Sequence, residues 1–259
     1  MGLRLNKISD AVIRENLLQS IALLQSLQET AAPEAGRQRE RHLVSIADLN
    51  FEIGTMTYQQ EGSPAEVRAA LAKAGQYFLE GIHGRQPPNA TDSRNPYEFE
   101  KAISLVVCFC DTSFRKSLGS FREDKYRYPP HLETQLFGEY LVELIKFLSR
   151  GTLDAEVLAS VIKRAKADSA SRDDHVFTLA KARGLQALQA GNVSEWERAV
   201  VELVDAHRDE ALKGEYKLLA DGFIALPALM LARLGMERGY TCRVNSPYLP
   251  FGLLVDIPA

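Results

Sequence analysis

The stretch that decides the fold is the apolar run at residues 218–239, LLADGFIALPALMLARLGMERG. Large apolar residues occur on every side of a helix drawn through it. A helix of that kind normally lies at the centre of a fold, covered by other helices. The run ends at Arg238 and Gly239, a basic residue followed by the glycine that commonly terminates helices. We therefore expect a central apolar helix in this part of the chain.

A rigid elbow follows the apolar run at residues 245–250, NSPYLP. Its two prolines fix the backbone, which is typical of a tight connection. We expect Tyr248 and Leu249 to pack on the central helix, so the elbow serves the fold and is not a binding site.

Apolar residues at three-and-four spacing predict eight more helices upstream of the run. Ser9 is suited to cap the first helix, and Ser63-Pro64 and Asn95-Pro96 begin capping boxes with proline at the first helical position. The expected ranges are 10–29, 33–58, 63–81, 95–110, 131–149, 153–169, 174–190 and 194–213. The predicted fold class is all-α, with about nine helices packed as antiparallel hairpins around the apolar C-terminal helix. The pair 174–190 and 194–213 makes the fold partly helical-repeat-like.

The length of 259 residues fits a single all-α domain over residues 1–259. The most polar and breaker-rich segment is 84–94, GRQPPNATDSR. It allows a second interpretation, in which an N-terminal subdomain 1–84 is joined by the loop 85–94 to a C-terminal body 95–259.

Charge and composition exclude several classes of protein. The formal net charge is −3, so the chain lacks the basic surface with which general nucleic-acid binders displace counterions. No apolar run reaches the roughly 20 residues that span a bilayer, and the N-terminus lacks the apolar core of a signal peptide. Three cysteines, an odd number, fit a reducing compartment. We expect a cytoplasmic protein that binds neither nucleic acid nor membrane.

The residues that usually carry chemistry occur without a matching pattern. The five histidines form no His-Glu-x-x-His motif and none has a cysteine at zinc spacing. Cys108 and Cys110 are two residues apart on a predicted helix, which suits packing better than a disulfide or redox pair. We expect no catalytic residue, metal or cofactor, and a metal- or small-molecule-dependent helical enzyme is the least favoured alternative.

One predicted helix carries an acidic stripe beside an apolar one. On a helix starting at Ser194, with about 100° per residue, four carboxylates fall within about 80°. Trp196, Val200 and Leu203 form the neighbouring apolar face. The acidic stripe is either an ordinary solvated face or a docking surface for a basic partner, where opposite charges speed encounter. The candidate partner-binding residues of this acidic stripe are Glu195, Glu202, Asp205 and Asp209.

Several short motifs stand together in the last third of the chain. They are LPAL at 226–229, Arg238-Gly239, the elbow NSPYLP at 245–250 and ARGLQAL at 182–188, followed by Trp196 in its long helix. With these motifs the chain resembles the immunity protein 49 family, a group of helical proteins encoded beside bacterial polymorphic toxins.

The resemblance implies a protein that is not an enzyme. Such a protein binds its cognate toxin tightly and blocks the active site or substrate path, which protects the producing cell. It implies a toxin that acts in the cytoplasm. The expected partner is a basic nuclease, and an acidic patch can mimic the phosphates that its substrate groove binds. A helical-repeat adaptor that binds peptides or protein partners is the alternative function. The oligomeric state stays open.

Overall fold

The protein was analysed as a computed structural model that describes residues 5–30, 36–83, 96–118, 132–167 and 172–254. Within these ranges every regular element is helical, which confirms the predicted all-α class. The α-helices are α1 (Asp10–Glu29), α2 (Gly36–Gln59), α3 (Pro64–His83), α4 (Pro96–Phe109), α5 (Ser113–Ser117), α6 (Leu132–Arg150), α7 (Ala155–Ala167), α8 (Arg172–Ala190), α9 (Val193–Leu212) and α10 (Leu226–Met236), and the 3-10 turns are η3 (Glu215–Leu218), η4 (Ala220–Phe223) and η5 (Phe251–Leu253).

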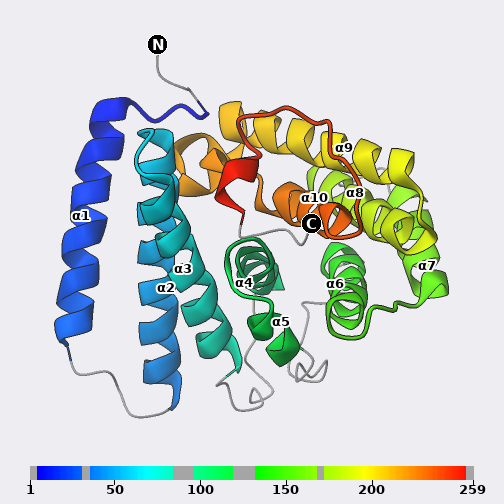
Figure 1. Ribbon diagram of the computed structural model, residues 1–259, viewed down its shortest axis with the longest axis horizontal. Helices are drawn as coiled ribbons and strands as arrows, with labels where there is room; N and C mark the ends of the chain where they lie inside the picture. The colour runs from blue at the N-terminus through cyan, green and yellow to red at the C-terminus, as the bar shows by residue number, and fades with distance from the viewer. Residues whose placement is uncertain (1–4, 31–35, 84–95, 119–131, 168–171, 255–259) are drawn as a thin grey trace.

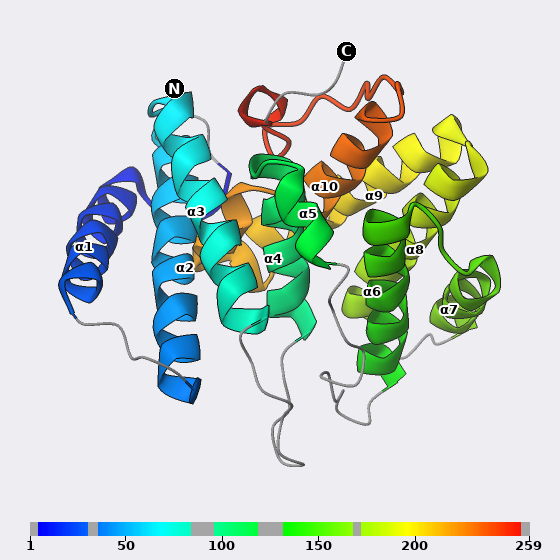
Figure 2. The same cartoon turned by 60° about the horizontal axis from the view of Figure 1, so that its bottom comes forward.

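Helices that follow one another in the chain pack against each other. This holds for α1 with α2, α2 with α3, α3 with α4, α6 with α7, α7 with α8 and α8 with α9. Figures 1 and 2 show α1, α2 and α3 side by side at one end of the molecule, α6 to α9 at the other, and α4 and α10 between them. The predicted hairpins are therefore present, and the two groups meet at α4 and α10.

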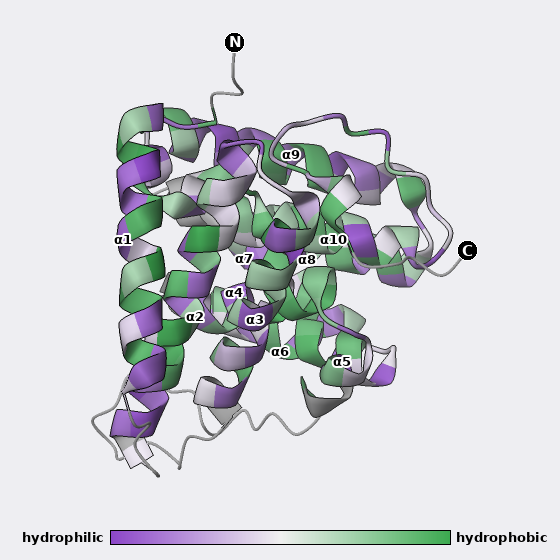
Figure 3. Ribbon diagram, turned by 60° about the vertical axis from the view of Figure 1, so that its left-hand side comes forward, coloured by the Kyte–Doolittle hydropathy of each residue, from purple (hydrophilic) through white to green (hydrophobic). Residues whose placement is uncertain are grey.

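Helix α1 forms an edge of the molecule. It packs chiefly against α2, and of its residues only Ile13 and Ser20 are buried. Figure 3 shows hydrophilic and hydrophobic residues alternating along its outward side. Ser9 caps this helix as predicted, because its side chain accepts a hydrogen bond from the Val12 backbone N–H.

Helix α10 is the central helix that the apolar run predicts. Every side chain from Ala228 to Gly235 is buried, and the helix packs against α4, α8 and α9. Its end is closed as expected, with Gly239 at a φ of 80° and the Tyr240 N–H bonded to the Gly235 carbonyl.

Close backbone approach fixes α8, α9 and α10 against one another. The Trp196 indole Nε1 donates to the Leu231 carbonyl over 2.8 Å. A Cβ added at Gly235 would lie 2.2 Å from the Trp196 ring, and one added at Gly184 would lie 2.3 Å from Leu231 Cδ2. The rigid Trp196 ring leaves no room for a side chain at Gly235, whereas a side chain at Gly184 would have to displace the Leu231 side chain.

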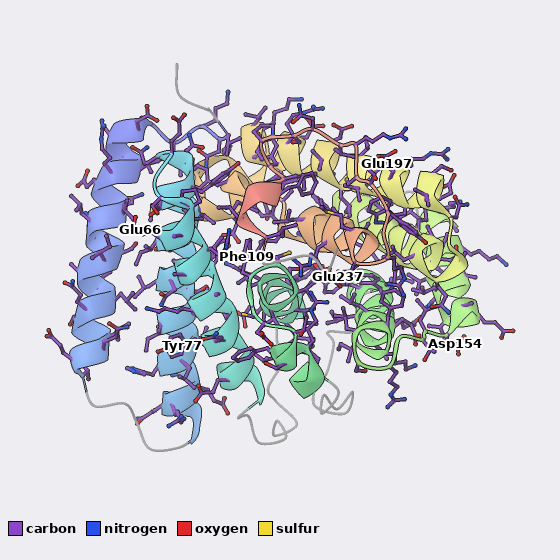
Figure 4. The ribbon with its side chains drawn as sticks, viewed as in Figure 1. Glu66, Tyr77, Phe109, Asp154, Glu197 and Glu237 are labelled. Atoms are coloured by element: carbon purple, nitrogen blue, oxygen red, sulfur yellow. The ribbon has the colours of Figure 1, made fainter. Side chains whose placement is uncertain are left out.

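A buried charge network lies at the end of α10. Arg233 is fully buried, and its Nε donates to Glu237 over 2.6 Å. Arg115 donates to both Glu237 oxygens and to the Val107 carbonyl. Burial alone would raise the pKa of Glu237, but hydrogen bonds from Arg115 and Arg233 and their charges lower it overall. Figure 4 shows Glu237 between α10 and α4, so the network joins these helices.

The first part of the apolar run, residues 218–225, does not form the continuous α-helix that its composition predicts. Residues 215–223 form the turns η3 and η4, and α10 begins only at Leu226. The reason is Pro227, which has no N–H and whose ring would clash with the Phe223 carbonyl in a continuous helix. At the start of α10 the same proline is favourable.

The other predicted boundaries compare closely with the structure. Helices α3 and α4 begin at Pro64 and Pro96, as the capping boxes predict. The short helix α5 was not expected. Its turn is favoured by the Asp111 carboxylate, which accepts from the Ser113 N–H over 2.8 Å. Residue 33, the predicted start of the second helix, and the polar segment 84–94 lie outside the described residues.

The C-terminal segment ties the two ends of the chain together. Tyr248 is buried, and its hydroxyl donates to the Leu5 carbonyl over 2.7 Å. The Tyr58 hydroxyl in α2 donates to the Pro247 carbonyl, and Arg68 in α3 donates to the Leu253 carbonyl. These bonds cross the boundary suggested at 85–94, and we propose that the chain folds as one domain.

The same segment is held to α9. The Arg243 N–H donates to the Glu197 carboxylate over 2.7 Å, and Figure 4 shows Glu197 on α9 where this segment passes. Farther along α9, His207 is buried, and the centre of its ring lies 5.7 Å from that of Tyr216 and 5.2 Å from that of Tyr248. His207 Nε2 lies 3.3 Å from the Gly222 carbonyl. Burial lowers the pKa of His207 to about 4, against smaller raising effects of Gly222 and Asp221.

Replacing Gly235 with alanine is expected to reduce the free energy of unfolding by about 1–3 kcal/mol, because the new methyl group overlaps the rigid Trp196 ring. The loss should be measured by urea unfolding. The matched control is Gly252→Ala, because a Cβ at Gly252 meets nothing within 4 Å. Equal stability of the two variants would contradict the close packing of α9 on α10.

Stability is expected to fall on mild acidification through His207. Because its folded-state pKa is below that of the unfolded chain, the unfolded chain takes up a proton between pH 6.5 and about pH 4 that the folded chain does not. Between pH 7 and 5 this costs about 2 kcal/mol. The His207→Gln variant should lose about that much less than the natural protein over the same interval, measured by urea unfolding at both pH values. An identical loss in both proteins would show that His207 titrates normally.

Candidate functional site

The acidic stripe predicted on α9 is present on its outward side. The helix begins one residue earlier than expected, at Val193, and its cap is Asn192 instead of Ser194. The Asn192 side chain accepts from the Glu195 N–H over 3.2 Å. Glu195 and Glu202 are half-buried, whereas Asp205 and Asp209 are exposed.

Each carboxylate of the acidic stripe is paired with a basic side chain of the protein itself. Arg183 in α8 bridges Glu195 and Glu202, at 3.3 and 3.0 Å. This bridge ties α8 to α9. The remaining pairs lie along α9 or just past its end, namely Glu195 with Arg198, Asp205 with Arg208 and Asp209 with Lys213. The acidic stripe thus carries as many basic partners as carboxylates, and exposed pairs of this kind contribute little to stability.

The apolar face beside the acidic stripe is core. Trp196, Val200 and Leu203 are each at most 1% exposed, because this face packs on α8 and α10. Only the charged side of α9 is therefore open to a partner.

An open groove of about 1050 Å³ lies on another part of the surface, between α4, α8, the end of α9 and η3. Helix α4 presents Glu98, Glu100 and Lys101 to it, and α8 presents Lys181. The segment 214–219 forms another wall. Sequence reasoning did not find this groove, because its lining comes from segments more than a hundred residues apart and none carries a motif.

A buried ion pair lies in the groove wall. Lys181 Nζ donates to Glu100 Oε2 over 2.6 Å, and both side chains are about 5% exposed. Lys181 also lies 4.8 Å from the centre of the Phe137 ring. The Tyr140 hydroxyl contacts the same carboxylate, and burial followed by the Glu100 charge raises the pKa of Tyr140 well above its usual value.

Lys101 occupies the other end of the groove. Its Nζ lies 3.1 Å from Asp221, 3.8 Å from Asp48 and 3.7 Å from the centre of the Phe51 ring. Burial raises the pKa of Asp48 to about 6. Lys101 opposes this shift, whereas the nearby carboxylates, Glu98 first, add to it. One lysine is therefore surrounded by several carboxylates.

The raised pKa of Tyr216 shows that the groove is acidic. Burial raises the pKa of its phenol, and the negative charges of Asp221, Glu100, Glu210 and Glu215 add to the shift. Four carboxylates from the four elements α4, α9, η3 and η4 therefore act on one side chain in the groove.

The thiols of Cys108 and Cys110 are held in their protonated form. Burial raises the pKa of the Cys110 thiol to about 12, and it raises that of Cys108 further, so neither supplies the thiolate that nucleophilic catalysis needs. Both thiols are packed in the core, as predicted. No three His, Cys, Asp or Glu side chains among the described residues are placed to hold a metal ion. No helix in the described ranges is long and apolar enough to cross a membrane.

Comparison with known protein families gives a match to one family model. The family model described as Immunity protein 49 matches residues 61–253. The match covers α3 to α10 and the C-terminal elbow, including the groove and the acidic stripe, while α1 and α2 precede it. It extends well beyond the C-terminal third in which the sequence motifs lie. No curated protein and no solved structure gives a match to the chain.

Proposed function

The chain belongs to the immunity protein 49 family, and we propose on this basis that it neutralises a cognate bacterial toxin by forming a stoichiometric complex. The family match is the observation that carries the proposal. Immunity proteins act by binding and not by turnover, and a helical body whose Cys108 and Cys110 thiols burial keeps protonated fits that role.

Inhibition in this proposal is steric. The protein covers the active site or the substrate path of the toxin, and a densely packed helical body loses little conformational entropy when it binds. Specificity comes from the match of charges and of apolar contacts across the interface.

The proposed partner is a toxin domain that acts on nucleic acid in the cytoplasm, delivered in competition between bacteria by a polymorphic toxin system such as type VI secretion. Nucleases are basic around the groove that binds phosphates. The immunity protein has a formal net charge of −3 and a groove rich in carboxylates. Opposite charges of this kind speed association and favour the correct partner.

The four carboxylates of the acidic stripe are proposed to take part in steering the toxin. Each already has a basic partner on the same protein, so its field at a distance is reduced. Contact with the toxin would exchange these internal pairs for intermolecular ones. We therefore assign the acidic stripe a contribution to encounter and not the main part of the affinity.

Protection is the first expected outcome. A sensitive bacterium that expresses the toxin encoded beside this gene should grow only when this protein is co-expressed. The two purified proteins should form a one-to-one complex by size-exclusion chromatography with light scattering, and the activity of the toxin should be lost at equimolar ratio. Absence of both protection and complex would refute the proposed function.

Reversing the acidic stripe should slow association. The variant Glu195→Lys, Glu202→Lys, Asp205→Lys, Asp209→Lys is expected to bind the toxin about two- to tenfold more slowly at low salt, and with a smaller difference at high salt. Surface plasmon resonance at two ionic strengths measures this. The milder Asp205→Asn, Asp209→Asn variant keeps Arg183 paired and serves as a check on folding. An unchanged rate for both variants would place the acidic stripe outside the interface.

A further inference from the structure

We infer that the groove between α4, α8, the end of α9 and η3 is the seat for a lysine- or arginine-bearing loop of the toxin. This inference rests on the proposed function and adds to it the contact surface and the chemistry of the segment that occupies it. Three properties of the groove carry it, namely its charge, an unsatisfied buried carboxylate oxygen and its exposed apolar rim.

The groove has an excess of negative charge. Its lining includes the five carboxylates Glu98, Glu100, Glu210, Glu215 and Asp221, and four lysines. Two further carboxylates, Asp48 and Asp209, pair with lysines of the groove. The five lining carboxylates exceed the four lysines by one negative charge, and Asp48 and Asp209 add further negative charge beside the groove. The groove is therefore the place to which a basic partner is drawn.

Three of the four lysines of the groove are already engaged. Lys181 is paired with Glu100, Lys101 with Asp221 and Lys213 with Asp209. A phosphate or another small anion would have to break these pairs, and nucleic acid would be repelled by the excess of carboxylates. By contrast, no basic side chain among the described residues pairs with Glu98 or Glu215. These two carboxylates are open to a partner's cation.

Glu100 supplies a second, independent indication of a ligand. The residue is 4% exposed and lines the groove. The carboxylate accepts from Lys181 at Oε2 and is also hydrogen-bonded by the Tyr140 hydroxyl, whereas its buried Oε1 atom has no hydrogen-bond partner among the described residues. A buried carboxylate oxygen without a partner is costly. An arginine or lysine side chain entering the groove satisfies it with a charge-assisted hydrogen bond.

The rim of the groove provides apolar contacts for the same segment. Tyr97, Leu218 and Leu219 line the groove and are 42%, 62% and 49% exposed. The Tyr97 ring is held in place by stacking on Phe137, with centroids 4.6 Å apart. Exposed apolar side chains around a charged centre suit a basic residue with a long aliphatic stem, flanked by apolar neighbours. A protein loop provides that combination.

The test uses an inactivated form of the toxin domain encoded beside this gene, with association and dissociation measured by surface plasmon resonance. The variant Glu98→Lys, Glu215→Lys should weaken binding by about tenfold or more, mainly through slower association at low salt. The variant Leu218→Ala, Leu219→Ala alters only exposed side chains and should speed dissociation about three- to tenfold. Amide exchange in residues 214–219 should slow in the complex with the natural protein.

The matched control is Glu15→Lys, Glu29→Lys on α1, which makes the same charge change at two exposed sites outside the groove. It should bind within about twofold of the natural protein, as expected for charges outside an interface. Unfolding curves of each variant separate misfolding from loss of contact.

If the natural protein binds and both groove variants bind equally well, the groove is not the binding site of the loop and the proposed function stands. If the groove variants change only self-association of this protein, a second copy is the occupant and the inference is overturned. If the natural protein itself does not bind the toxin, the proposed function fails first.

Discussion

The structure depends on one constraint, which is that α10 has no side that can face water. Eight consecutive residues of this helix are buried, so it must be enclosed on all sides, and α4, α8 and α9 do this. The enclosure works only because Gly235 and Gly184 let the neighbouring helices approach without a side chain between them. The fully buried Arg233 on the same helix is a second constraint, because its charge needs a partner inside the protein. Glu237 pairs with Arg233 and also with Arg115, and this network fixes α10 to α4 and α5.

The surface of the molecule follows from that enclosure. Since the inner faces of α4, α8 and α9 are used on α10, only their outer faces and ends remain for a partner. On the outer face of α9 the carboxylates meet basic side chains of α8 and α9 and are neutralised. Where α4, α8 and the end of α9 meet η3, carboxylates exceed lysines and Glu100 keeps one oxygen unsatisfied. Charge is thus balanced on the acidic stripe and unbalanced in the groove.

The helices could be predicted from sequence because their signals are local. Ser9, Pro64 and Pro96 each predict the start of a helix to within one turn. The spacing of apolar residues in each segment predicts which face is buried. Prediction failed where the signal was ambiguous or distant. Pro227 lies inside an apolar run whose composition alone predicts one continuous helix. The cap of α9 is Asn192, two residues before the predicted helix start at Ser194. The groove and the pairing of Glu202 with Arg183 depend on tertiary contacts, which no spacing in the chain encodes.

The place of α10 in the chain has a consequence for biosynthesis. Translation supplies α1 to α9 before the helix around which several of them close, and domains fold as units as they emerge from the ribosome. Until α10 is released, the faces of α4, α8 and α9 that later cover it stay unsatisfied, so the nascent chain passes through a stage with exposed apolar surface. Tyr248 then joins the segment after α10 to Leu5 near the opposite end of the chain. A ribosome that stalls before this point yields a product that cannot close its core, and such a product is a substrate for chaperones and proteases.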